Sequence, residues 1–220
     1  MMLTHRVVYF WAVLVTLCVV GCAPGRLEPL ANDFSPGANA DEGYILASVT
    51  SNGGRSAKFY IRHVLDGVVR PLESRGTGLF ELASDFADEQ DSGRNSSQRG
   101  RLMLVAVPAG QYELINWALL LIRREHDRKR LTPAQLPAIP FSVRAGEVVY
   151  LGNLHVAVTY GGDPGSVPGP LAPIVTARAR VTDRSARDVA LMAERYPNFL
   201  HSPLRLSVKS RPEWDLTIQR

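Results

Sequence analysis

Short apolar runs separated by turn-forming residues constrain the fold of this chain more than any other feature of its sequence. They follow one another between residues 44 and 181, with Gly, Pro, Asn or Asp between most of them. Runs of this length, rich in β-branched and aromatic residues, favour a mainly β fold, an antiparallel β-sandwich, over a helical one. The predicted strands are Tyr44–Thr50, Phe59–Leu65, Leu79–Leu82, Leu102–Val107, Gln111–Ile122, Ile139–Val143, Glu147–Tyr160 and Ile174–Val181.

One later segment has helical periodicity instead. Ser185, followed three residues later by Asp188, fits a capping box with Asp in place of the usual Glu, and Pro197 ends the pattern. The apolar face would be formed by Val189, Met192, Ala193 and Tyr196. We therefore expect one C-terminal amphipathic helix that packs on the sandwich near its last strand.

The N-terminal segment has the features of a secretory signal. Arg6 precedes an almost unbroken apolar stretch, Val7–Val20, and small residues follow it. The stretch is shorter than the roughly 20 residues that a membrane-spanning helix needs. The signal therefore predicts export of the chain from the cytoplasm.

The end of this signal, Val19-Val20-Gly21-Cys22, resembles the lipobox of bacterial lipoproteins. The resemblance implies that Cys22 carries the lipid, such as palmitate, and that the chain is cut just before it. Ala23 stands where an Asp would retain such a protein in the inner membrane, which implies an outer-membrane destination facing the periplasm. An ordinary cleaved signal with a chance cysteine, or an uncleaved anchor, are the alternatives.

The two cysteines and the change in composition after the signal divide the chain. Cys18 lies in the segment to be discarded, so a lipidated Cys22 leaves the mature domain no thiol for a disulfide, a metal site or a nucleophile. Many Pro, Gly, Asn and Asp residues follow Cys22, which favours a flexible linker, with a packed loop as the alternative. We expect a signal peptide (1–21), a lipidated flexible tether (22–42), a β-sandwich domain (43–184) and a C-terminal helix and tail packed on the sandwich (185–220).

Two turn motifs carry a second resemblance, within Leu102–Val158. The motifs are Pro108-Ala109-Gly110-Gln111-Tyr112 and Phe141-x-Val143-x-Ala145-Gly146-Glu147-x-x-Tyr150-Leu151-Gly152. They are similar to a pattern of uncharacterised bacterial envelope lipoproteins with transthyretin-like or carboxypeptidase-regulatory-like β-sandwiches. These motifs concern turns and imply a fold without a function. For Tyr112 and Tyr150 we expect buried rings whose hydroxyls bond to nearby backbone groups.

The titratable residues give no signature of catalysis, of a metal site or of a cofactor. His63, His126, His155 and His201 lack zinc-ligand spacing, and no nucleophile motif is present. Strand parity predicts a buried or edge position for His63 and a solvated face for His155. The acidic stretch after Asp85 fails as a calcium loop, because Arg99 stands where a bidentate Glu is required. A formal net charge of +4, together with export, argues against a nucleic-acid partner.

One charge cluster follows directly on the apolar run Leu114–Ile122. Its cations are Arg123, Arg124, Arg128, Lys129 and Arg130. A solvated hairpin tip that prevents edge-to-edge aggregation is one interpretation. The other is contact with an anionic membrane surface or with another, acidic envelope protein.

The sequence thus predicts a membrane-anchored, non-catalytic binding or structural module of the cell envelope, held by lipid on Cys22. The alternative is an envelope hydrolase acting on glycan or lipid. Its site would be assembled from scattered groups such as His155, Asp163 or Asp183.

Overall fold

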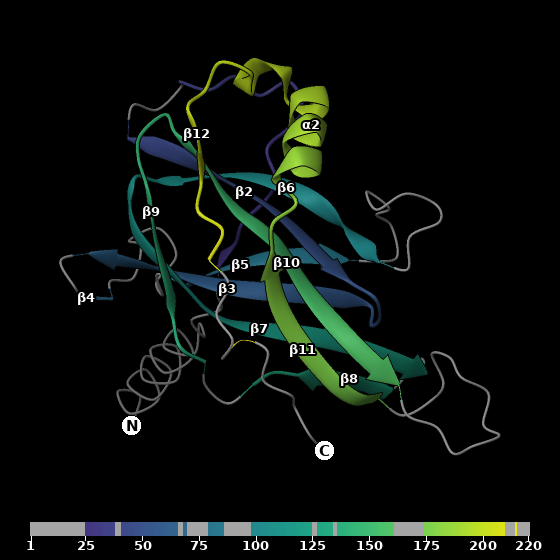
Figure 1. The fold of residues 1–220 in the computed structure, drawn as a ribbon. Helices are drawn as coiled ribbons and strands as arrows, with labels where there is room; N and C mark the ends of the chain where they lie inside the picture. Colours follow the sequence, from purple (N-terminus) through teal and green to yellow (C-terminus); the bar gives the residue numbers. More distant parts are fainter. Residues whose placement is uncertain are drawn as a thin grey trace, which may run out of the picture.

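Two β-sheets pack face to face in the computed structural model, which describes residues 25–37, 41–65, 68–69, 79–85, 98–124, 127–133, 136–160, 174–209 and 214 (Figure 1). Sheet A contains β1 (Gly25–Arg26), β3 (Ser56–Leu65), β4 (Val68–Val69), β5 (Leu79–Asp85), β7 (Gly110–Arg124), β8 (Asp127–Leu131) and β9 (Ile139–Val143). Sheet B contains β2 (Glu42–Ser51), β6 (Arg99–Pro108), β10 (Val148–Tyr160), β11 (Ile174–Thr182) and β12 (Leu204–Leu206). The mainly β prediction is confirmed.

The strand order brings distant parts of the chain together. Sheet A has the order β1-β5-β3-β7-β8, with β4 on β3 and β9 on β7. Sheet B has the order β11-β10-β2-β6, with β12 on β10. Most pairs are antiparallel, but β10 runs parallel to both β2 and β12. Seven of the eight predicted strands lie within observed ones, and β9 has the predicted bounds; the eighth, Glu147–Tyr160, begins one residue before β10.

The main core fills the space between the two sheets. Alternate residues of each strand point inward because successive side chains of a strand face opposite sides. Sheet B contributes Ile45, Val49 and Val156, among others, and sheet A contributes Phe59 and Trp117. All five side chains are 1% exposed or less, so this core supplies most of the hydrophobic stabilisation.

A second apolar core lies on the outer side of sheet B. Helix α2 (Ser185–Arg195) and the 3-10 helix η1 (Pro197–Phe199) cover the upper part of that sheet in Figure 1. Tyr44 and Leu46 of β2 pack there against Met192 and Phe199, so β2 is buried on both faces. The helix thus packs on the sandwich over β2, β6 and β10 rather than over the last predicted strand.

A bulge in β10 decides which polar side chains face α2. The ladder between β10 and β2 shifts its register between Tyr150 and Gly152, and Gly152 has a φ of +103°, which favours glycine. The shift places Asn153 and His155 on the same face as Tyr150. Without the extra residue they would point into the main core.

The start of α2 differs from the predicted capping box. The backbone N–H of Ser185 donates to Asp183 Oδ1 at 2.8 Å, so Asp183 satisfies a group that helix termini leave open. Asp188 is turned toward sheet B and is 1% exposed. The capping-box prediction is wrong because tertiary hydrogen bonds to sheet B hold Asp188 away from the helix N-terminus.

Residues 25–37 form a packed segment, which we call the N-terminal strap. β1 pairs in parallel with β5, and the Leu30 N–H donates to Leu104 O of β6 at 2.8 Å. The Phe34 ring then lies 6.2 Å from Tyr44 and 6.1 Å from Phe199, between ring centroids. For these residues the flexible-tether prediction does not describe the structure, and the packed-loop alternative does. The apolar side chains of Leu27, Leu30 and Phe34 supply the physical reason.

Candidate functional site

A chain of buried polar side chains lies between sheet B and α2. Ser48 Oγ donates to Asp188 Oδ2 at 2.6 Å, and the Tyr150 hydroxyl donates to the same oxygen at 2.8 Å. Thr50 Oγ1 donates to Asn153 Oδ1 at 2.8 Å and lies 2.8 Å from His155 Nδ1. We call these six residues the polar cluster. β2, β10 and α2 position them, and all of them are buried.

The hydrogen bonds of the polar cluster fix the tautomer of His155. Thr50 has one hydroxyl proton, which it uses in the bond to Asn153. Its contact with His155 therefore needs a proton on Nδ1, so the neutral imidazole carries its lone pair at Nε2. Burial, together with the Arg184 and Arg180 guanidiniums, lowers the pKa of His155 to about 4. The imidazole is thus neutral at physiological pH.

The predicted solvated face for His155 is wrong, since only 8% of this residue is exposed. Sequence parity correctly groups it with Asn153. The imidazole is nevertheless buried, with Thr50 in hydrogen-bond contact and the Arg184 and Arg180 guanidiniums nearby.

The sequence pattern gives no sign that Asp188 belongs to a site. Asp188 lies in the first turn of a predicted helix, where an acidic residue is expected for capping, so its position suggested no further role. The structure leaves Asp188 Oδ1 buried without a hydrogen-bond partner among the described residues. Burial and the neighbouring Asp188 carboxylate raise the pKa of Tyr150, so its hydroxyl stays protonated and donates.

The two expectations for the tyrosines are met in different ways. The Tyr112 hydroxyl donates to Pro108 O at 2.6 Å, the backbone bond that we predicted. The Tyr150 hydroxyl accepts from the Arg184 N–H at 3.2 Å, but it donates to a side chain. Tyr150 therefore links the β-sheet to the helix.

His63 is buried on the opposite sheet, as its strand parity predicts. It is 4% exposed and stacks on Tyr112, with ring centroids 4.7 Å apart. Neither ring nitrogen has a hydrogen-bond partner among the described residues. A Cβ at Gly110 would lie 2.3 Å from His63 Nε2, so glycine is required there to make room for the ring. Burial lowers the pKa of His63.

The basic cluster lies on a hairpin, as one of the two interpretations expected. β7 and β8 pair antiparallel, with Arg124 opposite Asp127. We call the hairpin that carries Arg123, Arg124, Arg128, Lys129 and Arg130 the basic hairpin. The Arg130 guanidinium donates to the Tyr60 hydroxyl and lies 5.7 Å from the centre of its ring, which anchors β8 to sheet A. Of the other four cations, only the backbone is described.

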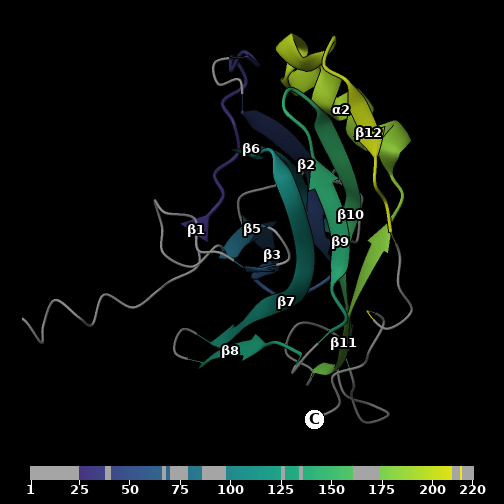
Figure 2. The ribbon, with the colours of Figure 1, turned by 90° about the vertical axis from the view of Figure 1, so that its left-hand side faces the viewer.

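The basic hairpin and β1 lie on the side of the molecule away from α2. Figure 2 shows both to the left, whereas α2 and β12 lie to the upper right. Cys22 itself is outside the described residues, but it precedes Gly25 by only three positions.

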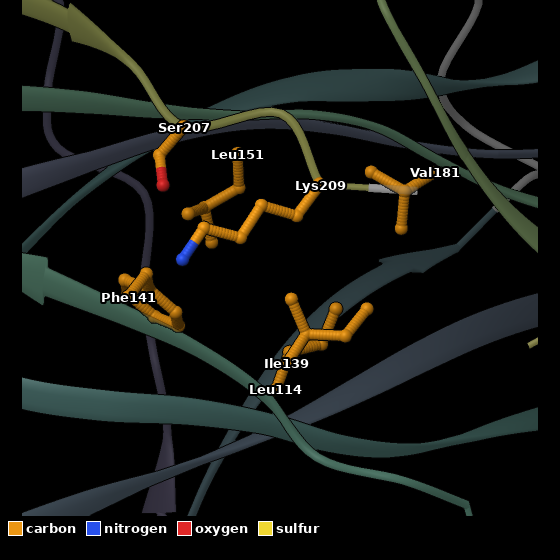
Figure 3. A pocket seen from close by; sticks show the side chains of 7 residues that line it. All are labelled: Leu114, Ile139, Phe141, Leu151, Val181, Ser207 and Lys209. Carbon is orange, nitrogen blue, oxygen red and sulfur yellow. The ribbon is translucent and has the colours of Figure 1, made fainter. Parts of the chain in front are cut away.

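A small pocket opens between the sheets at the β9 edge. Apolar side chains such as Leu114, Phe141 and Val181 line it, and its volume is about 10 Å³. In Figure 3 the Lys209 side chain lies across these apolar side chains. Its amine donates to Pro140 O at 2.6 Å. The pocket has room for about one water molecule.

Of the other candidate residues, the structure describes Asp183 and His201, and both are exposed. Asp183 is at the exposed start of α2, and hydrogen bonds from Ser185 lower its pKa. Asp163 and His126 are outside the described residues, as is the acidic stretch between residues 86 and 97. Among the residues that are described, no group of three or more His, Cys, Asp or Glu side chains could hold a metal ion. In the same part of the chain, no helix is long and apolar enough to cross a membrane.

Comparisons with known proteins add no family. No protein-family model and no curated protein matches the chain. A solved leucine-rich repeat protein from Bacteroides thetaiotaomicron aligns with 53% of this chain and 14% of its own, at 13% identity and a TM-score of 0.30. Agreement at this level carries no argument about fold or function.

Proposed function

We propose that the protein is a lipid-anchored, non-catalytic module of the bacterial cell envelope that lies against the membrane through the side carrying β1. The signal and Cys22 supply the anchor in this proposal. Ala23 after the cysteine favours the outer membrane, facing the periplasm.

The observation that carries the proposal is how soon the folded domain begins after Cys22. Gly25 is already paired with Phe80 of β5. Three residues span at most about 11 Å when fully extended, so a lipid on Cys22 would hold this sheet edge close to the bilayer. A long flexible linker would have left the orientation of the domain free.

The basic hairpin supports the same orientation. It lies on the same side of the molecule as β1 in Figure 2, at the opposite edge of sheet A, so it faces the membrane when this side of sheet A does. Cations near an anionic bilayer contribute about 1 kcal/mol each. We infer that anionic lipid is the partner of this side of the protein.

Burial of the polar cluster supports a binding or structural role over catalysis. Ser48 is 3% exposed and Asp188 is 1% exposed, beneath α2. Their hydrogen bonds join the helix to the sheet, which is a structural task. A partner protein would meet the opposite, α2-bearing side of the module.

The anchor is tested by Cys22→Ala, with Cys18→Ala as the matched control, since the discarded signal contains Cys18. We expect Cys22→Ala to abolish palmitate labelling and to release a folded domain from membranes washed in high salt. The Cys18→Ala protein should be labelled and fractionate like the unaltered protein. Retention of labelling or of membrane fractionation by Cys22→Ala would show that the anchor is not an acyl chain on this residue.

A further inference from the structure

The outer face of sheet B below α2 brings three nitrogen-bearing side chains together. In Figure 1 the lower halves of β10 and β11 face the viewer, and none of the described helices or strands covers them. His155 of β10 is directly opposite Arg180 of β11. Residues opposite each other on antiparallel strands share a face, with Cβ atoms about 5 Å apart.

Arg184 approaches the same place from the turn between β11 and α2. Its Nη2 donates to Gln98 Oε1 at 2.5 Å, next to the start of β6. β10 and β2 lie between β11 and β6 in sheet B. The Arg184 side chain therefore reaches across the strand that carries His155.

The His155 imidazole has one ring nitrogen, Nε2, that makes no hydrogen bond within the polar cluster. Nδ1 is used in the contact with Thr50, so Nε2 is the free nitrogen. Both arginines act on the charge of His155, and no acidic side chain of the described residues is among the groups that shift its pKa. Asp188 is on the same side of the sheet, but Ser48 and Tyr150 occupy its Oδ2.

We propose that His155, Arg180 and Arg184 form a binding site for an oxyanion of the phosphate or sulfate type. Guanidinium groups bind such oxyanions through paired, charge-assisted hydrogen bonds. A dianion beside the two arginines would favour a proton on His155 Nε2, which then becomes a third donor. The site faces away from the side assigned to the membrane, and it does not depend on the lipid anchor.

In the test, the protonation of His155 itself reports whether sulfate binds. The ¹H–¹³C signal of its Cε1 is followed by NMR in the purified mature protein, in neutral detergent at pH 5.5. Sodium sulfate is the probe, because it does not titrate in this range, and sodium chloride of equal ionic strength is the reference. If sulfate binds the protonated form tenfold more tightly, the pKa of His155 rises by one unit at saturation. The protonated fraction then increases from about one in thirty to about one in four.

Matched controls separate binding from screening. His63, buried on the other sheet, should show no sulfate-specific change. Arg180→Gln and Arg184→Gln should each abolish the difference between sulfate and chloride, whereas Arg144→Gln, in the exposed turn before β10, should preserve it. Equal His155 signals in 50 mM sulfate and in matched chloride would overturn the proposal. So would a sulfate effect that survives both arginine substitutions.

Two further arms distinguish the sources of the oxyanion. Glycerol 3-phosphate represents a free phosphate monoester, and vesicles containing phosphatidylglycerol represent a lipid phosphate. We expect the soluble phosphate to reproduce the sulfate effect, since the site faces away from the bilayer in the proposed orientation. A response to the vesicles alone would contradict the proposed site for a free oxyanion.

Discussion

Asp188 is the residue whose contacts in the structure differ most from those that its position in the sequence suggests. It stands in the first turn of a surface helix, yet its carboxylate accepts hydrogen bonds from two strands of sheet B. Hydrogen bonds to charged groups contribute about 1.5–3 kcal/mol each, and a buried donor that loses its acceptor is costly. The attachment of α2 therefore depends on this side chain as well as on Met192 and Phe199.

We expect Asp188→Ala to lower the free energy of unfolding by about 3 kcal/mol, because Ser48 and Tyr150 lose their acceptor. Asp188→Asn keeps one oxygen for both donors and should cost about 1 kcal/mol. Urea unfolding measures both. Glu194→Ala, at an exposed position of the same helix, is the control and should change stability by less than about 0.5 kcal/mol. Equal stabilities of Asp188→Ala and Glu194→Ala would show that the polar cluster does not hold the helix.

The local sequence explains why this residue was not predicted. An acidic residue three positions after Ser185 satisfies the capping pattern, so nothing in the segment demands another role. Its true partners, Ser48 and Tyr150, are distant in sequence. His155 shows the same limit, since parity gives its face but not what covers that face.

At the level of elements, the position of the basic hairpin in the fold favours one of the two interpretations of its charge cluster. A charge run alone is equally consistent with a solvated tip. Its location on the same side of the molecule as β1, at the other edge of sheet A, is what favours the membrane (Figure 2).

Replacing Arg123, Arg124, Arg128, Lys129 and Arg130 with Gln should weaken binding to vesicles containing phosphatidylglycerol at least tenfold at low salt. The reason is the loss of about 1 kcal/mol per cation. Vesicle co-sedimentation measures this, with phosphatidylcholine vesicles as the reference. Arg187→Gln with Arg195→Gln, on α2, is the control and should leave binding unchanged. Unchanged, salt-insensitive binding by the hairpin variant would refute the membrane contact.

The strands that contain an apolar run bounded by turn residues were predictable, as for β9 and β10. The strands without such a run were not. β8 has the sequence Asp-Arg-Lys-Arg-Leu and no apolar signal, so only its pairing with β7 makes it a strand. β1 pairs for two residues and β12 for three, again through partners far away in the chain. The parallel pairing of β2 with β10 is likewise a property of the tertiary structure.

At the scale of the whole molecule, two buried histidines make stability depend on pH. The pKa of His63 and that of His155 both lie below the ordinary value of 6.5 in the folded protein. Between the folded and unfolded pKa values the unfolded chain binds more protons. The stabilisation is therefore complete above about pH 6.5 and is lost as the pH falls toward 4.

We expect the free energy of unfolding to fall by up to about 2.7 kcal/mol per pH unit just below pH 6, since each histidine contributes at most about 1.4. Urea titrations at pH 7.5, 6.0, 5.5 and 5.0 measure this slope. His155→Gln should reduce it by about 1 kcal/mol per pH unit, and His63→Phe should reduce it in the same direction. A slope that neither substitution changes would assign the acid sensitivity to other groups.

The N-terminal strap also has a consequence for the order in which the molecule is assembled. Its partners are Glu81 of β5, Leu104 of β6 and Phe199 of η1, all of which follow it in the chain. As the chain emerges from its N-terminus, the strap cannot make all of these contacts until residue 199 is available. Until the strap docks, the edges of β5 and β6 remain open to other chains. The first described segment to emerge is therefore among the last to reach its place.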